Sequence, residues 1–171
     1  MFVSGRSAAG SCYRWGFALS VEERLASLGL VLPEPPAAVA AFEPFALVGD
    51  AVYTSGQIAT RDGKLVATGV LGVDVDLDGG QQAARACALN VLAQLNAAAG
   101  SLDRIARLVK ITVFVASAPT FTQQPQVADG ASRLLIDVLG DAGRHARSAI
   151  GVAALPLGTP VEIEAVALLA G

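Results

Sequence analysis

Residues 108–115 read Leu-Val-Lys-Ile-Thr-Val-Phe-Val, the clearest strand signal in the chain, because β-branched side chains dominate them. Successive side chains of a strand point to opposite faces of the sheet, so one face is expected to receive Val109, Ile111, Val113 and Val115. Lys110 and Thr112 fall on the other face. The alternation predicts a strand with one buried face.

A helical pattern flanks this strand on each side. Before the strand, residues 80–99 place apolar side chains at spacings of four and three, at Ala84, Ala88, Val91, Leu95 and Ala98. After the strand, residues 126–139 do the same with Val127, Ala131, Leu134, Leu135 and Val138. Gly100 and Gly140 follow as helix terminators. Two helices are therefore predicted, each with one apolar stripe.

Further strands are predicted at both ends of the chain. Phe45–Val48 and Ala51–Thr54 flank a Gly49-Asp50 turn and predict a hairpin, and residues 146–153 and 160–169 predict two closing strands. A short helix is expected from Val21, with Ser20 as its N-cap. This order predicts an α+β domain with a single mixed sheet and both long helices on one face. The uncovered apolar face then requires another subunit.

Composition excludes several classes of protein. Of 171 residues, 53% are hydrophobic and 16% charged, which is the reverse of the balance in a disordered chain. The net charge of −3 argues against a nucleic-acid partner, and no membrane span is predicted. Cys12 and Cys87 have no metal-ligand spacing, so they are interpreted as reduced thiols of a cytoplasmic protein, with Cys87 buried on a helix.

The first twenty residues differ from the rest. Residues 1–20 hold two arginines, no acid and many Ser, Gly and Ala residues, and Arg14 interrupts the apolar run that a signal peptide requires. They are interpreted as a flexible extension, or as the product of a start placed too far upstream. Residues 21–171 are predicted to form one domain.

Most catalytic signatures are missing from the sequence, which has no G-x-S-x-G elbow, P-loop or G-x-G-x-x-G. Its one histidine, His145, is interpreted as a solvated loop side chain. Arg147 is unusual in an apolar strand, and Glu162 and Glu164 share one face of the next strand. Two interpretations remain open. An Arg–Glu pair fixes the sheet register or a subunit contact, or Arg147 receives a substrate carboxylate while a glutamate places water or a proton.

Several segments together resemble one protein family. They are Tyr53-Thr-Ser-Gly-Gln-Ile58, Val109-Lys-Ile-Thr-Val-Phe-Val115, Ala146-Arg-Ser-Ala-Ile150, Leu155-Pro156 and Val161-Glu-Ile-Glu-Ala165. Over residues 42–169 the chain resembles the RidA/YjgF family, also called reactive-intermediate deaminases or L-PSP endoribonuclease-like proteins. Residues 143–148, Gly-Arg-His-Ala-Arg-Ser, resemble a less characterised branch.

The resemblance implies a chorismate mutase-like α+β fold and a homotrimer with three clefts between neighbouring subunits. It also implies hydrolysis of 2-imino or 2-enamino acids to keto acid and ammonia, with no metal or organic cofactor. By this resemblance, Arg147 is expected to bind the substrate carboxylate, and Glu162 is expected to position the attacking water. Ser55 and Gly56 match the segment that lines the cleft.

Two positions depart from the family pattern. Ala149 stands where the family has a cysteine, and Phe45 stands where a tyrosine is often found. The polarity of the expected pocket is therefore altered while its arginine remains. The predicted function is an imine or enamine deaminase that acts on a small carboxylated metabolite. The alternatives are a non-catalytic module that binds such a metabolite in the same cleft and, less favoured, a ribonuclease.

Overall fold

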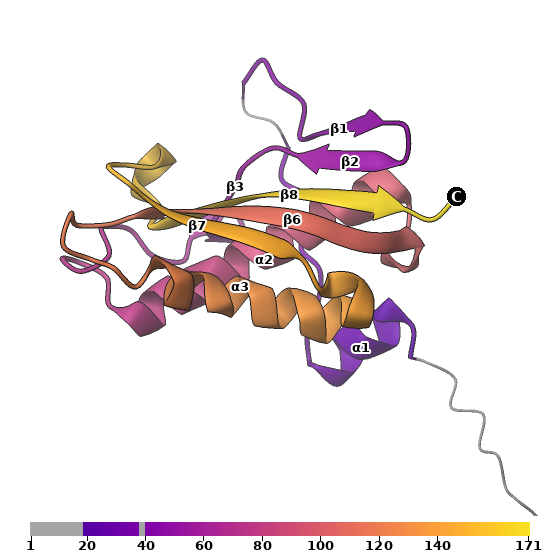
Figure 1. The fold of residues 1–171 in the computed structure, drawn as a ribbon, viewed down its shortest axis with the longest axis horizontal. Helices are drawn as coiled ribbons and strands as arrows, with labels where there is room; N and C mark the ends of the chain where they lie inside the picture. Colours follow the sequence, from indigo (N-terminus) through magenta and orange to yellow (C-terminus); the bar gives the residue numbers. More distant parts are fainter. Residues whose placement is uncertain (1–18, 38–39) are drawn as a thin grey trace, which may run out of the picture.

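The computed structural model describes residues 19–37 and 40–171 and contains one main sheet. Its strands lie in the order β1-β2-β8-β6-β7 (Figure 1). Their bounds are β1 Phe45–Val48, β2 Ala51–Thr54, β6 Ile105–Ala116, β7 Ala146–Val152 and β8 Val161–Leu169. The short strand β3 (Gln57–Ile58) also pairs with β8. Because β6 and β7 run parallel and the other pairs antiparallel, the sheet is mixed, as predicted.

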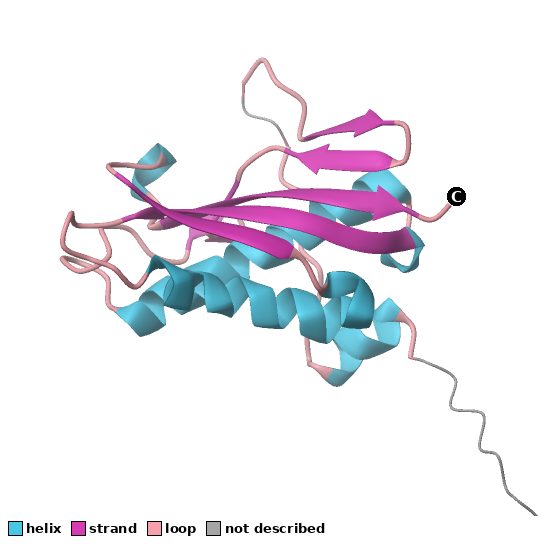
Figure 2. Ribbon diagram, viewed as in Figure 1, coloured by secondary structure: helices cyan, strands magenta, loops and turns pink. Residues whose placement is uncertain are grey.

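Two long helices cover one face of this sheet. They are α2 (Leu77–Ala99) and α3 (Gln124–Leu139), and Figure 2 shows both on the same side of the strands. The short α1 (Val21–Ser27) lies near one end of α3. The remaining elements are small: β4 Thr60–Arg61, β5 Lys64–Leu65, η1 Leu102–Arg104, η2 Gly140–Gly143 and η3 Pro156–Gly158. No helix in the described ranges is long and apolar enough to cross a membrane.

The predicted alternation of β6 holds in its second half and fails in its first. Ile111, Val113 and Val115 are fully buried beneath the helices. Val109, however, is 38% exposed, and Leu108 takes the buried place instead. The pairing of β6 with β8 shifts register between Leu108 and Lys110, and such a bulge reverses the face on which the side chains before it lie.

The helix ends follow local capping chemistry. The α2 helix begins at Leu77, three residues before the predicted start, because the Asp76 carboxylate accepts a hydrogen bond of 2.8 Å from the Gly79 amide. It ends at Ala99, and the C-cap that follows is Gly100, whose φ of +77° suits glycine. At α1, Ser20 is the predicted N-cap and forms a capping box with Glu23.

The helices α2 and α3 pack closely where small residues meet. Gly130 of α3 lies against the backbone carbonyl of Gln81, and a Cβ at position 130 would collide with that oxygen. Gly80 of α2 similarly leaves room for Leu71 and Val127. The spacing of the two helices is therefore set by backbone contact.

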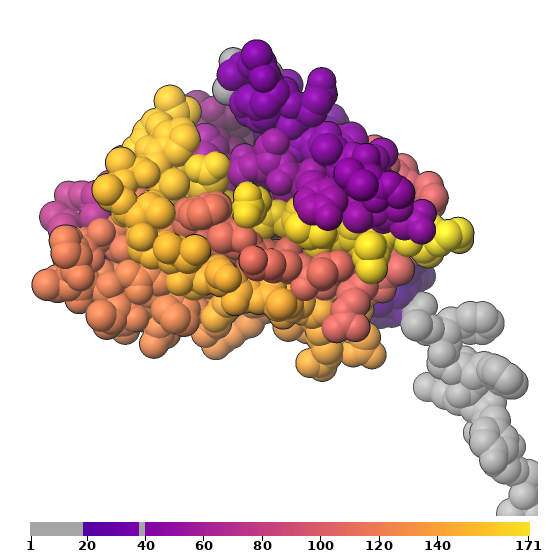
Figure 3. All heavy atoms as spheres, turned by 45° about the horizontal axis from the view of Figure 1, so that its top comes forward, coloured from indigo at the N-terminus to yellow at the C-terminus, as the bar shows by residue number. Residues whose placement is uncertain are grey.

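The other face of the sheet carries no helix. Figure 3 shows atoms of β1, β2 and β8 at the surface on this side. Large apolar side chains are exposed on it, namely Tyr53, Ile150 and Leu168. The predicted uncovered face is present, and it carries the charged residues Lys110, Glu162 and Glu164 beside these apolar side chains. Residues 1–18, which include Cys12 and most of the predicted extension, lie outside the described residues.

Candidate functional site

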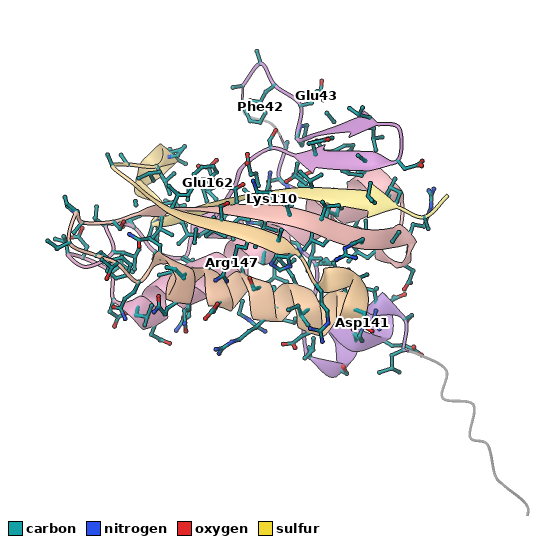
Figure 4. All side chains as sticks on the ribbon, viewed as in Figure 1. Phe42, Glu43, Lys110, Asp141, Arg147 and Glu162 are labelled. Atoms are coloured by element: carbon teal, nitrogen blue, oxygen red, sulfur yellow. The ribbon has the colours of Figure 1, made fainter. Side chains whose placement is uncertain are left out.

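Arg147 lies on β7, at the edge of the sheet. Its Cα partner on β6 is Ile111, a buried residue, so Arg147 shares the face that the helices cover. The side chain runs toward α3, as Figure 4 shows, and remains 23% exposed. The guanidinium is therefore at the rim of the layer between sheet and helix, partly open to solvent.

Three acceptors on α3 hold the guanidinium. Its Nη1 donates to Asp129 Oδ1 at 2.9 Å and to Ser132 Oγ at 3.0 Å, and its Nη2 donates to the Pro125 carbonyl at 3.1 Å. The acceptors are spaced by four and three residues, so they lie on one side of the helix. They fix the position of the charge, and the Asp129 carboxylate balances it.

His145 extends this network. Its Nδ1 lies 2.6 Å from the Gly143 carbonyl, which can only accept, so Nδ1 carries the proton of the neutral ring. Its Nε2, 3.1 Å from Ser132 Oγ, then accepts the serine proton. Burial lowers the pKa of His145, with the charge of Arg147 adding to the effect and the Gly143 carbonyl opposing it. The interpretation of His145 as a solvated side chain was therefore wrong.

Glu162 lies on the opposite face of the sheet. Its Cα partners are Phe114 on β6 and Ile58 on β3. Its carboxylate leans over Gly56, where a Cβ would collide with Oε1. Burial raises the pKa of Glu162, and the nearby charge of Glu164 raises it further. The predicted shared face of the two glutamates is confirmed by their register with β6.

The known contacts of Ser55 and Phe45 stabilise the fold. The Ser55 hydroxyl donates to the Glu43 carbonyl at 2.6 Å, and its amide donates to the Pro44 carbonyl at 2.9 Å. Phe45 is partly buried against the core. The loop that holds Glu43 lies above β8, on the same side as Glu162 (Figure 4). The register of Phe45 with Thr54 places the Phe45 side chain on the face that the helices cover, opposite Glu162. Among the described residues, no hydrogen bond links Ser55 to Arg147.

The structure does not bring Arg147 and Glu162 together within one chain, because they lie on opposite faces with β6 between their strands. An Arg–Glu pair within one sheet, part of one of the two open interpretations, does not form in the described part of the chain, where the ion pair of Arg147 is with Asp129. Ala149 faces the helices two residues further along β7 and packs against the core. The arginine and the glutamate therefore belong to one site only if a neighbouring molecule completes it.

Two hollows of the described residues lie away from Arg147 and Glu162. One of about 780 Å³ is bordered by α1, residues 29–32 and residues 96–103. Another of about 360 Å³ is bordered by residues 31–34, residues 60–62 and α2. Neither hollow is lined by Arg147 or Glu162.

Two observations describe the metal-ligating and thiol side chains of the described residues. No group of three His, Cys, Asp or Glu side chains there could hold a metal ion. Cys87 is buried on α2, as predicted, and donates to the Val161 carbonyl at 3.3 Å. Burial raises the pKa of its thiol, so the thiolate is disfavoured.

Sequence reasoning missed Asp129 and Ser132. A signal was present, because both fall within the predicted helix of residues 126–139, beside the apolar stripe that holds Ala131. Polar residues beside a buried stripe lie at the edge of the layer between helix and sheet, where they can meet a charged side chain from the sheet. The strand that would meet them could not be identified from periodicity alone.

Comparison with known proteins agrees with this fold. The family model described as "YjgF/chorismate_mutase-like, putative endoribonuclease" matches residues 22–169. Protein TCP17 of Trypanosoma cruzi is 46% identical over 146 residues, which are 85% of this chain and 91% of TCP17. The crystal structure of Atu1372 from Agrobacterium tumefaciens, a protein of unknown function, is 46% identical, with a TM-score of 0.82 over 88% of this chain and 92% of that one.

A more distant solved structure has a bound ligand. It is that of TdcF from E. coli with bound serine, which is 27% identical, with a TM-score of 0.61 over 80% of this chain and 94% of that one. The family match spans most of the chain and includes Arg147, Glu162 and the helix α3 that holds Arg147. The chain belongs to the YjgF/chorismate mutase-like family, also known as RidA/YjgF.

Proposed function

We propose that this protein hydrolyses small 2-imino or 2-enamino acids to the corresponding keto acids and ammonia. The observation that carries the proposal is the Arg147 guanidinium, which is fixed by α3 and still partly open to solvent. A planar guanidinium binds a carboxylate through two parallel hydrogen bonds, which a lysine ammonium cannot reproduce. It therefore suits a substrate whose reactive carbon is next to a carboxylate.

The chemistry requires little beyond orientation. The carbon of a 2-imino acid is already electrophilic, and water adds to it to give a carbinolamine, which loses ammonia to leave the keto group. Arg147 holds the carboxylate, and Glu162 orients the water and accepts its proton. A carboxyl whose pKa is raised by burial is better matched to proton transfer near neutral pH than an exposed one. Positioning of this kind supplies much of the barrier reduction in such reactions.

A homotrimer is part of this proposal. The sheet face that holds Glu162 exposes large apolar side chains and has no helix over it, and Arg147 lies on the other face at the sheet edge. A cleft between neighbouring subunits would bring an arginine and a glutamate to one substrate. Light scattering should give about three times the 17.3-kDa chain mass. A monomeric mass would contradict the intersubunit site.

An amino-acid-sized ligand is also supported by a relative. TdcF, whose structure has serine bound, shares the fold over most of both chains. Serine has a carboxylate next to a carbon that bears nitrogen, as a 2-imino acid does. The proposed substrate class therefore has the same pair of groups.

The test is a coupled assay. An amino-acid oxidase generates a 2-imino acid in the presence of semicarbazide, which traps it, and the protein should reduce the rate of trapping. Arg147→Ala should abolish the effect. Arg144→Ala is a matched control, because Arg144 is exposed and pairs only with Asp141 in the described residues. Equal activity of wild type and Arg147→Ala would refute the assigned role of the arginine.

A second candidate is a module that binds a carboxylated metabolite without converting it. The substitutions at Ala149 and Phe45 favour it, because they remove a thiol and a hydroxyl from the expected pocket. Thermal-shift measurements with keto acids and amino acids separate the two candidates. Stabilisation that requires Arg147, without turnover in the coupled assay, would support the module.

The ribonuclease activity in the family description is less favoured for this chain. Its net charge is −3, whereas a surface that follows a nucleic-acid backbone is basic. RNA cleavage that survives nuclease removal and disappears in Arg147→Ala would reverse this preference.

A further inference from the structure

We propose that Asp129 makes the Arg147 site selective for ligands that bear a positively charged nitrogen next to the carboxylate. The inference rests on the proposed function, since it takes Arg147 as the carboxylate anchor. It adds a second recognition residue, on α3, for the nitrogen of the same ligand. The ligand class is the zwitterionic α-amino acid or protonated 2-imino acid, as opposed to the keto acid.

Asp129 is placed to contact a ligand. Its Oδ1 accepts from Arg147 Nη1 at 2.9 Å, while its side chain remains 40% exposed. Among the described residues, no hydrogen bond uses Asp129 Oδ2. One carboxylate oxygen therefore holds the arginine and the other is available to a donor that approaches from solvent.

The charges favour one kind of ligand. Arg147 and Asp129 together are neutral, so a carboxylate bound at the guanidinium leaves one uncompensated negative charge next to Asp129. Like charges at such distances repel, more strongly where water is partly excluded. A ligand with a cationic nitrogen restores neutrality and gives Asp129 a partner.

The spacing of the ligand's groups agrees with this arrangement. In an α-amino or 2-imino acid, one carbon separates the carboxyl carbon from the nitrogen. The guanidinium and the Asp129 carboxylate are direct hydrogen-bond partners. When the ligand carboxylate binds Arg147, the ligand nitrogen therefore lies within reach of Asp129.

Ser132 and His145 keep the anchor in place independently of Asp129. Ser132 Oγ accepts from the same Nη1 at 3.0 Å, and it is itself held by His145 Nε2 at 3.1 Å. The Pro125 carbonyl holds Nη2. Removal of the Asp129 charge therefore leaves two acceptors on the guanidinium, so the selectivity and the anchor can be tested separately.

The consequence for the proposed reaction is discrimination between substrate and product. The protonated imine has the cationic nitrogen, whereas the keto acid has lost it. Asp129 would hold the former and repel the latter, which assists product release.

Calorimetry with L-alanine and pyruvate tests the inference, since the two ligands share a carbon skeleton and a carboxylate. Wild type should prefer L-alanine. Asp129→Asn should shift the ratio of the two dissociation constants toward pyruvate by about tenfold, which corresponds to about 1.4 kcal/mol. Asp129→Glu, which keeps the charge, should retain most of the preference. A loss of packing alone would weaken both ligands together and leave the ratio unchanged.

The other outcomes distinguish a failure of the Asp129 role from a failure of the Arg147 anchor. An unchanged ratio in Asp129→Asn, with both ligands lost in Arg147→Ala, would overturn the role of Asp129 and leave the anchor intact. Unchanged binding in Arg147→Ala would overturn the anchor, and this inference with it. Absence of a preference for L-alanine in wild type would also overturn it. If Asp129→Asn fails to fold, Asp129→Ser is measured in its place, with the same ratio as the readout.

Discussion

The carboxylate of Glu162 occupies the space that a side chain at Gly56 would need. A Cβ at position 56 would collide with Glu162 Oε1, while the backbone of Gly56 is not in the left-handed region. The glycine is thus explained by space for a carboxylate and not by backbone conformation. The two residues, both expected from sequence to line a cleft, are adjacent on the uncovered face of the sheet.

Gly56→Ala should therefore displace the Glu162 carboxylate. The obstructing atom is the end of a flexible side chain, so the protein should fold and the cost should fall on activity. If Glu162 orients water in the proposed deamination, we expect the rate to fall by about a hundredfold, the lower end of the contribution of one positioned proton-transfer group. Steady-state kinetics in the coupled assay measures this loss.

A double variant identifies the route of the effect. On a Glu162→Gln background, Gly56→Ala should add little, because both changes act on the same group. If the two losses instead multiplied, Gly56 would act on the site independently of Glu162.

The pH dependence of stability should report the buried environment of Glu162. Since its pKa is raised in the folded protein, the folded chain retains a proton that the unfolded chain loses. The free energy of unfolding therefore falls as pH rises from the ordinary carboxyl pKa to the raised value. Glu162→Gln should remove this decrease, so the variant should gain stability relative to wild type at pH 7.5 and not at pH 4.

Urea unfolding at the two pH values measures the difference. Glu43→Gln is the control, because Glu43 is an exposed carboxyl on the same side of the sheet. Equal stabilisation by Glu162→Gln at both pH values would contradict the assignment.

His145 should respond to the charge of Arg147. It is the only histidine in the chain, so its ring gives a single titration curve in NMR. Arg147→Met should raise its pKa toward the ordinary value, and only in part, because burial is the larger cause of the lowering. Arg144→Met, next to it in sequence, should leave the curve unchanged. A larger effect of Arg144→Met would show that the Ser132–His145–Arg147 network is not formed.

The docking of α1 should depend on its cap and on one arginine. The Ser20 side chain accepts from the Glu23 amide, and Arg24 donates from Nε to the Val138 carbonyl at 2.6 Å. Ser20→Ala should cost about 1 kcal/mol, and amide exchange in α1 should accelerate. Ser27→Ala, near the helix end, is the control. Unaltered exchange in Ser20→Ala would show that packing of Val21 and Leu25 alone holds the helix.

Periodicity predicted those parts of the fold in which one local pattern dominates. The second half of β6 and the buried stripe of α3 were correct because burial there repeats at a single spacing. The prediction started α2 three residues too late, because Gly79 and Gly80 weaken the helical pattern in the first turn of a helix that Asp76 caps. The register shift before Lys110 was missed because a bulge leaves the alternation of residue types unchanged.

The site was predicted less completely than the fold. Arg147 was singled out for two reasons. It is an unusual charge in an apolar strand, and it matches the arginine position of a known family. Its partners could not be predicted in this way, because Asp129 and Ser132 meet it only after α3 crosses β7. Which face of β7 holds Arg147 depends on the register with Ile111, which no local pattern reports.

The contacts of Arg147 with α3 depend in turn on the close packing of α2 and α3 at Gly130. Asp129 precedes that glycine, and the backbone contact with Gln81 at Gly130 sets how near α3 comes to α2. A larger residue at position 130 would turn the acceptors of Asp129 and Ser132 away from Arg147 without altering any of the three. Ligand preference in relatives of this chain can thus diverge through substitutions on the side of a helix that no ligand reaches.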